Sequence, residues 1–510
     1  MDANLYTRFE EHAPDPSAAC LLLPGQGAVP SRVVTWGELA ARSARIANVL
    51  VGAGCVPGDR VMAQVDKLPD TLALYLGCLR AGVAYVPLNT GYQRRELEHF
   101  IGDAGPRVIV CRTDGRDTMM ALEPEATVFT LAADGGTLGA GARAQREEFA
   151  TVVRRPEDLA AILYTSGTTG RSKGAMLTHR NLATNATALV AAWGFTRGDT
   201  LLHALPVFHV HGLFVACHCA LLSGARMLWL PKFDATEVAA LLPRATVMMG
   251  VPTFYTRLLA EPSFTRDAAR HLRLFVSGSA PLLPETFAAF EARTGQRILE
   301  RYGMTETGMN TSNPLDGPRL AGTVGPPLPG VTIRIVDDAG APCAPGAIGG
   351  IEVKGPNVFP GYWNLPDKTR EEFTADGFFR TGDMGTWTNE GYVQIVGRAK
   401  DMIITGGLNV YPKEIEERID ALPGVEESAV VGVPDADFGE AVVGIVVGRA
   451  GHALTEASVI AALRGEIASF KVPKRVFFVV ELPRNSMGKV QKAVLREKFS
   501  SGIAGPREET

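Results

Sequence analysis

The sequence contains no long hydrophobic run. None of its segments approaches the ~20 consecutive apolar residues that a membrane-spanning helix requires. Residues 1–16 carry acidic side chains and no apolar core, so they lack the pattern of a secretory signal peptide. We therefore expect a soluble, cytoplasmic protein without a membrane partner.

A block of like charge is also missing. The 51 basic and 55 acidic side chains give a net charge of −4, which does not favour a nucleic-acid partner. The seven cysteines form no CxxC pair, and such scattered thiols are typical of a reducing compartment. The cysteines and histidines of residues 209–219 match no zinc-binding spacing.

Short apolar runs alternate with helical patterns up to about residue 325. Runs at residues 61–65, 84–88 and 107–110 predict strands, and residues 71–81 predict a helix between the first two. Strands that alternate with helices predict parallel sheets covered on both faces.

The pattern then changes. Strand-like runs separated by Gly/Pro turns predict a β-rich subdomain, and a compact α+β segment with helices at residues 412–421 and 456–469 follows. We predict an α/β fold: a large N-terminal domain (residues 1–397) of parallel α/β sheets plus the β-rich subdomain. A hinge (residues 398–400) joins it to a small, mobile α+β C-terminal domain (residues 401–510).

The most informative segment is residues 164–174, which follows an apolar run at residues 159–163. It holds five Ser/Thr hydroxyls, three glycines and two cations. Glycines let consecutive backbone N–H groups converge on an anion, and hydroxyls and cations complete such a site. Lys173 is followed by Gly174 and not by Ser or Thr, so this is not a Walker A loop. We interpret the segment as a loop that binds nucleotide phosphates.

Three later clusters supply other groups that a nucleotide site needs. Residues 301–307 offer an aromatic ring that can stack on adenine and a carboxylate that can hold Mg²⁺. Residues 380–383 place a carboxylate in a turn suited to ribose hydroxyls, and residues 483–489 place a single lysine on a turn. Each cluster alone has an ordinary interpretation as a turn, whereas their order and spacing together are specific.

Together the clusters resemble the acyl-adenylate-forming superfamily, which includes acyl-CoA synthetases, adenylation domains and firefly luciferase. The resemblance extends from residues 35–39 (TWGEL) to Lys489, and includes residues 205–212 (LPVFHVHG), 376–379 (DGFF) and 397–401 (GRAKD). It implies two half-reactions. A carboxylate attacks the α-phosphorus of ATP to give acyl-AMP and pyrophosphate, and a thiol, usually that of coenzyme A, then displaces AMP.

The resemblance also implies the role of each site residue. Lys489 would bridge the attacking carboxylate and the α-phosphate, Thr305 would contact the α-phosphate, and Glu306 would hold Mg²⁺. The implied ATP-binding residues, from the β- and γ-phosphates to adenine and ribose, are Thr165, Ser166, Gly167, Thr168, Thr169, Gly170, Arg171, Lys173, Tyr302, Asp383 and Arg398.

In this superfamily the small domain rotates between the half-reactions. The resemblance implies that Lys400 is the hinge and that Gly406 and Gly407 line the pantetheine channel after the rotation. Lys489 would then not be needed for thioester formation. Acetylation of the corresponding lysine in related synthetases also implies an acetyltransferase and a deacetylase as partners, since acetylation removes the charge of Lys489.

The acid is predicted from the helix that follows residues 251–253, because this helix bounds the acyl pocket in the family. Arg257 lies one turn into it. A cation that faces the pocket favours a second carboxylate, through a charge-assisted pair worth about 1.5–3 kcal/mol. The alternative is that Arg257 lies on the solvent side of an amphipathic helix.

A finer resemblance favours the first interpretation. Residues 249–259, 277–283 and 301–314 resemble bacterial malonyl-CoA synthetases, in which the helix arginine meets the distal carboxylate of malonate. We therefore predict a malonyl-CoA synthetase, with methylmalonate as an open second substrate. Three alternatives remain: a ligase for medium-chain or aryl acids, an adenylating module that acts on a carrier protein, and a non-catalytic nucleotide-binding relative. The further predicted pocket residues are His209, Ser277 and Met309.

Overall fold

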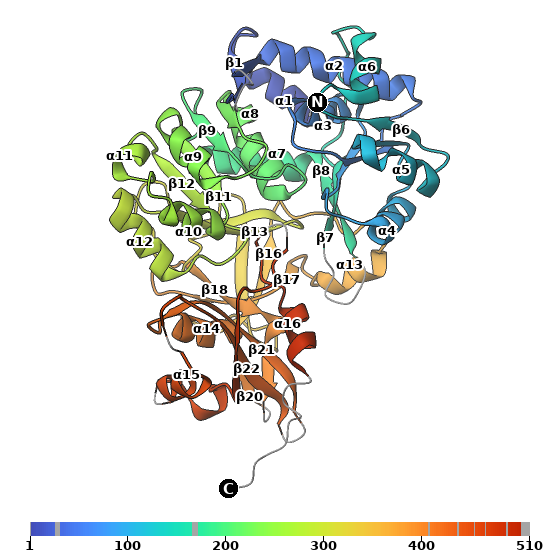
Figure 1. Ribbon diagram of the computed structural model, residues 1–510. Helices are drawn as coiled ribbons and strands as arrows, with labels where there is room; N and C mark the ends of the chain where they lie inside the picture. Colours follow the sequence, from blue (N-terminus) through green and yellow to red (C-terminus); the bar gives the residue numbers. More distant parts are fainter. Residues whose placement is uncertain are drawn as a thin grey trace.

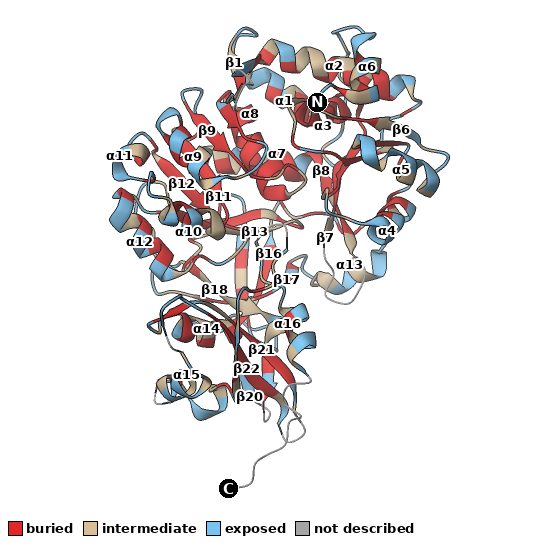
Figure 2. Cartoon of the chain, viewed as in Figure 1, coloured by how far each residue is buried: buried red, intermediate tan, exposed pale blue. Residues whose placement is uncertain are grey.

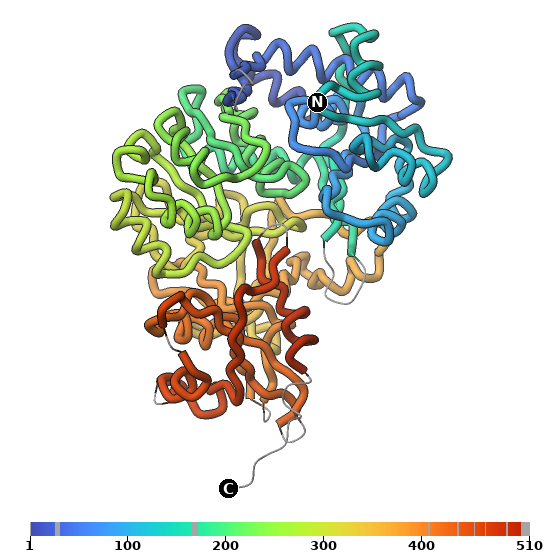
Figure 3. The backbone as a smooth tube through the Cα atoms, viewed as in Figure 1, coloured from blue at the N-terminus to red at the C-terminus, as the bar shows by residue number. Residues whose placement is uncertain are grey.

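The computed structural model describes residues 2–25, 31–165, 172–405, 408–435, 438–452, 454–464, 466–485 and 488–500. Two lobes of strands and helices lie side by side, one coloured blue to cyan and the other green, and the orange-to-red C-terminal segment lies below them (Figure 1). The tube in Figure 3 shows that the chain starts beside the green lobe, passes through the blue-to-cyan lobe, returns to the green lobe and then enters this segment.

The first lobe is built on a six-stranded sheet in the order β6-β5-β3-β4-β7-β8, in which only the β7–β8 pair is antiparallel. On β3, Val61 and Ala63 belong to one apolar core and Met62 to another, so both faces of the sheet are buried. The strands are β3 (Arg60–Gln64), β4 (Ala84–Pro87), β5 (Val108–Cys111), β6 (Thr127–Thr130), β7 (Leu159–Thr165) and β8 (Lys173–Thr178). The helices are α2 (Trp36–Gly52), α3 (Pro69–Ala81), α4 (Arg94–Ala104), η1 (Thr113–Gly115), α5 (Arg116–Leu122) and α6 (Gly136–Arg143).

The second lobe is built on an eight-stranded sheet in the order β14-β13-β12-β11-β9-β10-β1-β2, with parallel inner strands and antiparallel edge strands β2 and β14. The strands are β1 (Ala19–Leu23), β2 (Arg32–Thr35), β9 (Thr200–His203), β10 (Arg226–Trp229), β11 (Val247–Gly250), β12 (Leu274–Ser277), β13 (Leu299–Met304) and β14 (Gly308–Ser312). The helices are α1 (Leu5–His12), α7 (His179–Ala192), the π-helix η2 (His211–Cys217), α8 (His218–Ser223), α9 (Ala235–Leu241), η3 (Leu242–Arg244), α10 (Pro252–Ala260), α11 (Arg266–Ala269) and α12 (Pro284–Thr294).

A four-stranded antiparallel sheet follows, and after it the chain enters the C-terminal α+β unit. The first sheet contains β15 (Thr332–Val336), β16 (Gly349–Lys354), β17 (Phe379–Trp387) and β18 (Val393–Arg398), with α13 (Pro366–Glu372) before β17 and η4 (Ala399–Asp401) after β18. The C-terminal unit contains β19 (Ile403–Thr405), β20 (Leu408–Val410), α14 (Pro412–Asp420), β21 (Val425–Asp435), β22 (Gly439–Gly448), α15 (Glu456–Leu463), η5 (Ser469–Lys471), β23 (Arg475–Val479) and α16 (Lys492–Ser500).

This architecture confirms the predicted α/β fold class. Buried positions concentrate in the strands of the large sheets, and exposed positions lie on the outer helices (Figure 2). The predicted helix over residues 456–469 was too long, because α15 ends at Leu463 and Arg464 then pairs with Ile467 in an isolated bridge. Among the described residues, no helix has the length and apolar character needed to cross a membrane.

Candidate active site

A cleft of about 1060 Å³ lies between the two lobes, the four-stranded sheet and the C-terminal unit. Residues from position 87 to position 492 line it, so distant segments of the chain converge there. The predicted site residues that line it are Thr165, Lys173, His209, Ser277, Tyr302, Thr305, Glu306, Met309, Asp383, Arg398, Lys400 and Lys489. The predicted residues Ser166, Gly167, Thr168, Thr169, Gly170, Arg171, Gly406 and Gly407 lie outside the described residues.

Asp383 is held at the centre of a polar triad. It faces Arg398 across the β17–β18 ladder, and the Arg398 guanidinium donates from Nε to Asp383 Oδ1 at 2.6 Å. The Tyr302 hydroxyl donates to the other carboxylate oxygen. Burial, and then the Asp383 charge, raise the pKa of Tyr302 well above its usual range, so the phenol stays a donor. The carboxylate therefore has one orientation at the edge of the cleft.

Glu306 is a second buried carboxylate, close to the ends of β7 and β8. The Tyr362 hydroxyl donates to Glu306 Oε1 at 3.0 Å, and the Thr165 hydroxyl lies 3.4 Å from the same oxygen. Burial raises the pKa of Glu306 above its ordinary value. Lys173 lies beside this group, with its Nζ 4.0 Å from the centre of the Tyr362 ring. A carboxylate, a hydroxyl and a cation thus converge where β7 ends and β8 begins.

Lys489 enters the same cleft from the C-terminal unit. Its backbone N–H donates to Asn485 Oδ1 at 2.9 Å, which shapes the turn that carries it. At Gly488 (φ +73°) an added Cβ would lie 3.1 Å from the Thr253 hydroxyl oxygen, so this turn touches the start of α10. Loss of hydration in the cleft, and then the Arg398 charge, lower the pKa of Lys489. The side chain retains contact with solvent.

The opposite wall contains a buried guanidinium that the sequence analysis did not single out. Arg301 is only 4% exposed, and it packs on Gly278, where an added Cβ would lie 2.4 Å from Arg301 Cζ. Its Nε and Nη2 have no hydrogen-bond partner among the described residues. Burial lowers the pKa of Arg301 to about 9, so it stays charged at neutral pH. A cation inside an otherwise strand-like run, residues 298–302, was the signal available in the sequence.

The other predicted acyl-pocket residues surround this guanidinium. Ser277 and Met309 are each 1% exposed, and the Ser277 hydroxyl has no partner among the described residues. Burial, and then the Arg301 charge, lower the pKa of His209 to about 4, so its imidazole is neutral at pH 7. The buried guanidinium thus shares the cleft with these neutral side chains and with Glu300, whose carboxyl pKa burial raises to about 7.

The structure differs from the expectation for Arg257. Its side chain is exposed on α10 and does not line the cleft, whereas Pro252, Thr253 and Thr256 do. The N-terminus of α10 faces the cleft, and each further turn carries side chains about 5.4 Å along the helix axis. The cation of the pocket wall is consequently Arg301 on β13.

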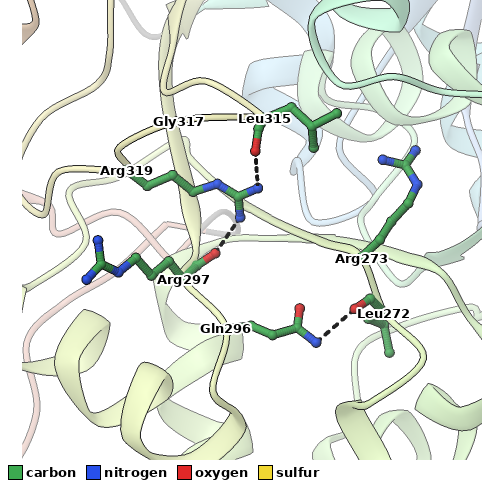
Figure 4. Close-up of a pocket in the computed structure, with 7 residues that line it drawn as sticks. All are labelled: Leu272, Arg273, Gln296, Arg297, Leu315, Gly317 and Arg319. Carbon is green, nitrogen blue, oxygen red and sulfur yellow. Dashed lines mark hydrogen bonds between the residues drawn. The ribbon is translucent and has the colours of Figure 1, made fainter.

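A smaller cavity of about 410 Å³ lies on the outside of the second lobe (Figure 4). Its guanidinium groups are already satisfied: Arg319 donates to the carbonyl oxygens of Arg297 at 2.6 Å and Leu315 at 2.9 Å, and Arg273 pairs with Asp199 at 2.8 Å. Gln296 likewise donates to the carbonyl oxygen of Leu272. These contacts join loops, so the arginines serve the fold rather than a ligand.

Comparison with known proteins gives the same picture over nearly the whole chain. The model of the AMP-binding enzyme family matches residues 11–363, and that of the AMP-binding enzyme C-terminal domain matches residues 414–489. Mouse mitochondrial malonate–CoA ligase ACSF3 is 36% identical over 92% of this chain and 87% of its own length. The feruloyl-CoA synthase of an Amycolatopsis species is 36% identical over 91% of this chain and 94% of its own length.

A solved structure is similar at higher identity. ATP-bound MatB from Rhodopseudomonas palustris has a TM-score of 0.95 and 54% identity, over 98% of this chain and 99% of that one. The TM-score is 0.84 against the apo form of the same protein. The overall arrangement of this chain is therefore closer to the ATP-bound form.

Proposed function

This chain belongs to the family of AMP-binding enzymes and is an ATP-dependent, AMP-forming acyl-CoA synthetase with CoA as cosubstrate, and we propose that its acid is malonate. The reaction would convert malonate, ATP and CoA into malonyl-CoA, AMP and diphosphate through malonyl-AMP. The observation that carries the proposal is the buried guanidinium of Arg301, whose Nε and Nη2 have no partner among the described residues.

The unpaired guanidinium favours an acid with a second carboxylate. A charge left buried without a partner is strongly unfavourable, whereas a carboxylate can accept two of its N–H groups. Malonate has a second carboxylate one carbon away from the reacting one, and the buried Met309 side chain limits the length of the pocket. A monocarboxylate such as acetate would leave Arg301 unpaired and would bind poorly. The similarity to mouse malonate–CoA ligase supports the same acid.

The first half-reaction is assigned to residues of the cleft. Asp383 and Arg398 would hold the ribose and Tyr302 would flank adenine. Lys489 would stabilise charge that develops between the attacking carboxylate and the α-phosphate. No enzyme nucleophile is required, because phosphoryl chemistry of this kind depends on positioning and charge neutralisation. The second half-reaction would follow rotation of the C-terminal domain.

The Glu306 carboxyl suits Mg²⁺, because Mg²⁺ prefers oxygen ligands and the Thr165 hydroxyl lies 3.4 Å from Glu306 Oε1. When bound, Mg²⁺ would neutralise phosphate charge. Thr305 would contact the α-phosphate, and the loop from Thr165 to Lys173 would hold the β- and γ-phosphates.

Several predictions about the mobile domain stay part of the proposal. The boundary at residues 398–400 falls at the end of β18 and the start of η4, with Lys400 as the hinge. Gly406 and Gly407 would line the pantetheine channel. Acetylation of Lys489 by an acetyltransferase, and its removal by a deacetylase, stay predictions from the family resemblance. The cytoplasmic location is a prediction too.

The test compares acids and two arginine variants. AMP release with ATP, Mg²⁺ and CoA is measured for malonate, methylmalonate, acetate, octanoate and ferulate. Arg301→Gln is expected to lower kcat/KM for malonate about 10- to 150-fold, equivalent to a charge-assisted pair of about 1.5–3 kcal/mol. Arg257→Ala, on the exposed side of α10, is the matched control and should change it less than threefold.

Three outcomes would contradict the proposal. Equal kcat/KM for acetate and malonate would remove the need for a second carboxylate. Preference for ferulate would assign the chain to aryl acids, the specificity named for its Amycolatopsis relative. Loss of malonate turnover in Arg257→Ala but not in Arg301→Gln would return the carboxylate contact to α10.

A further inference from the structure

A buried lysine lies outside the residues assigned to the reaction. Lys67 follows β3 of the first lobe and is 8% exposed, and it is the only lysine in the buried class among the described residues. No carboxylate of the described residues pairs with it. Its ammonium lies 4.5 Å from the centre of the Trp229 ring at the end of β10, which belongs to the other lobe. Lys67 therefore reaches from one large sheet to the other.

The contacts of Lys67 define the protonation state of one histidine. Lys67 Nζ lies 2.8 Å from His203 Nδ1 and donates to the His203 carbonyl oxygen at 2.8 Å. The Gly212 carbonyl oxygen near His203 Nε2 can only accept, so the ring proton lies on Nε2 and Nδ1 accepts from Lys67. His203 Nε2 then donates to the Gly212 carbonyl oxygen at 2.9 Å, with Cys217 Sγ at 3.3 Å as its other neighbour.

Gly212 connects this network to the acyl pocket. It lies in the first turn of η2, and a Cβ there would lie 2.0 Å from the Pro206 carbonyl oxygen, so the backbone is packed as closely as glycine permits. The preceding residue, His211, donates its backbone N–H to His209 Nδ1 at 3.2 Å. Its ring Nδ1 lies 3.2 Å from the hydroxyl of Ser279, which lines the cleft with His209.

Two features indicate strain that the surrounding structure maintains. Ser279 has φ +72°, a conformation that is costly for a residue with a side chain. The segment from His211 to Cys217 is a π-helix, a form that is rare and frequent at functional sites. Both need support from neighbouring contacts, and the Lys67–His203 pair provides one that reaches the first turn of η2.

We propose that Lys67 is a positioning residue for the acyl pocket, and that it acts through His203 and Gly212 to hold His209 and His211 in place. The proposal rests on the acyl-CoA synthetase function. It adds Lys67 and His203, neither of which lines the cleft, to the residues that determine how the acid binds. Their effect falls on the acid and not on ATP, because η2 directly follows Phe208, His209 and Val210, which line the cleft, and His209 is one of the residues predicted for the acyl pocket.

The position is maintained at a cost in stability. Burial lowers the pKa of Lys67 from 10.5 to about 7, and the titratable groups that face it are His203 on β9 and Cys217 on η2. Between these two pKa values the unfolded chain binds more protons than the folded one, so this contribution to stability rises with pH. The destabilisation of the folded protein by the buried Lys67 charge is fully present below pH 7 and is lost as the pH rises towards 10.5.

The experiment combines kinetics with thermal unfolding of the full chain. Lys67→Met removes the donor and the charge, and Lys232→Met, at an exposed lysine after β10, is the matched control. We expect KM for the acid to rise about tenfold or more in Lys67→Met, as misplaced binding groups typically cause, with KM for ATP within twofold of the native value. The Tm of Lys67→Met relative to the native protein should be highest at pH 6 and decrease towards pH 10.

Variants of His203 test the route of the effect. His203→Gln keeps an acceptor for Lys67 and a donor for Gly212, so it should retain most acid binding. His203→Leu has neither and should match Lys67→Met, and the double variant should be no worse than either single one.

The proposal is overturned if KM for the acid and KM for ATP rise together, or if Lys67→Met lowers Tm at every pH and leaves both KM values unchanged. If the native protein rejects malonate but adenylates another acid, the proposed substrate fails. The Lys67 variants are then assayed with that acid, so the two failures are distinguishable.

Discussion

Replacement of Lys489 by glutamine should separate the two half-reactions. In this structure the Lys489 turn touches the start of α10, where Gly488 lies against Thr253. The ammonium shares the cleft with His209, Asp383 and Arg398. Burial and then the Arg398 charge lower the pKa of Lys489, and the Lys489 charge adds to the effects of burial and Arg301 that lower the pKa of His209. Lys489 is thus placed for charge stabilisation at the acid. Rotation of the C-terminal domain would carry it away before CoA reacts.

The magnitude follows from the loss of one charged donor in a site partly shielded from water. Removal of one such preorganised donor typically lowers kcat about 10²- to 10³-fold, or about 2.7–4 kcal/mol. We expect this loss in acid-dependent exchange of pyrophosphate into ATP, which reports adenylation alone. CoA-dependent AMP release from supplied malonyl-AMP should change less than threefold.

Lys474→Gln is the matched control for this experiment, because Lys474 is an exposed lysine of the same C-terminal unit that lies over the Phe438 ring. It should leave both half-reactions at the native rate. Equal losses in the two half-reactions of Lys489→Gln would refute the reasoning, as would unchanged pyrophosphate exchange. The first result would mean that Lys489 acts in both conformations or in the fold itself.

Two further variants address other parts of the cleft. Asp383→Asn removes the charge that pairs with Arg398 at 2.6 Å. Because hydrogen bonds to charged groups are worth about 1.5–3 kcal/mol, KM for ATP should rise about 10- to 100-fold. A rise of less than twofold in ATP titrations would contradict this role. Gly303→Ala would place a Cβ 2.1 Å from the Gly308 carbonyl oxygen, which would displace strands β13 and β14 of the hairpin. Because misplaced site residues lower the rate steeply, acid-dependent pyrophosphate exchange should fall at least about 100-fold. Gly102→Ala, where a Cβ meets nothing within 4 Å, is the control and should raise stability by about 1 kcal/mol in helix α4.

The residues that the sequence predicts for the nucleotide side line one cleft in the structure, and several of them are paired within short local elements. Thr165, the last residue of β7, is the register partner of Lys173, the first residue of β8, and Asp383 and Arg398 are register partners on β17 and β18. Local spacing alone places such pairs together. The predicted helices and strands of the two lobes were correct for the same reason, since both periodicity and turn residues act over a few positions.

The acyl side was decided by tertiary structure. The family resemblance placed Arg257 at the pocket, whereas helix periodicity alone favoured the solvent side, where the structure places its side chain. The direction of Arg301 depends on the packing of β13 against Gly278, which is 23 positions away in the sequence. Lys67 and His203 are 136 positions apart, and no local pattern relates them.

The sequence by itself therefore determined the family and the fold class, and it predicted the ATP-handling groups, because motifs that close a turn or a hairpin carry their geometry with them. Only the tertiary structure showed which arginine lines the cleft and which buried contacts lie behind its wall. Charge burial is a property of the assembled core: an arginine or lysine is exposed or buried according to segments that lie far away along the chain.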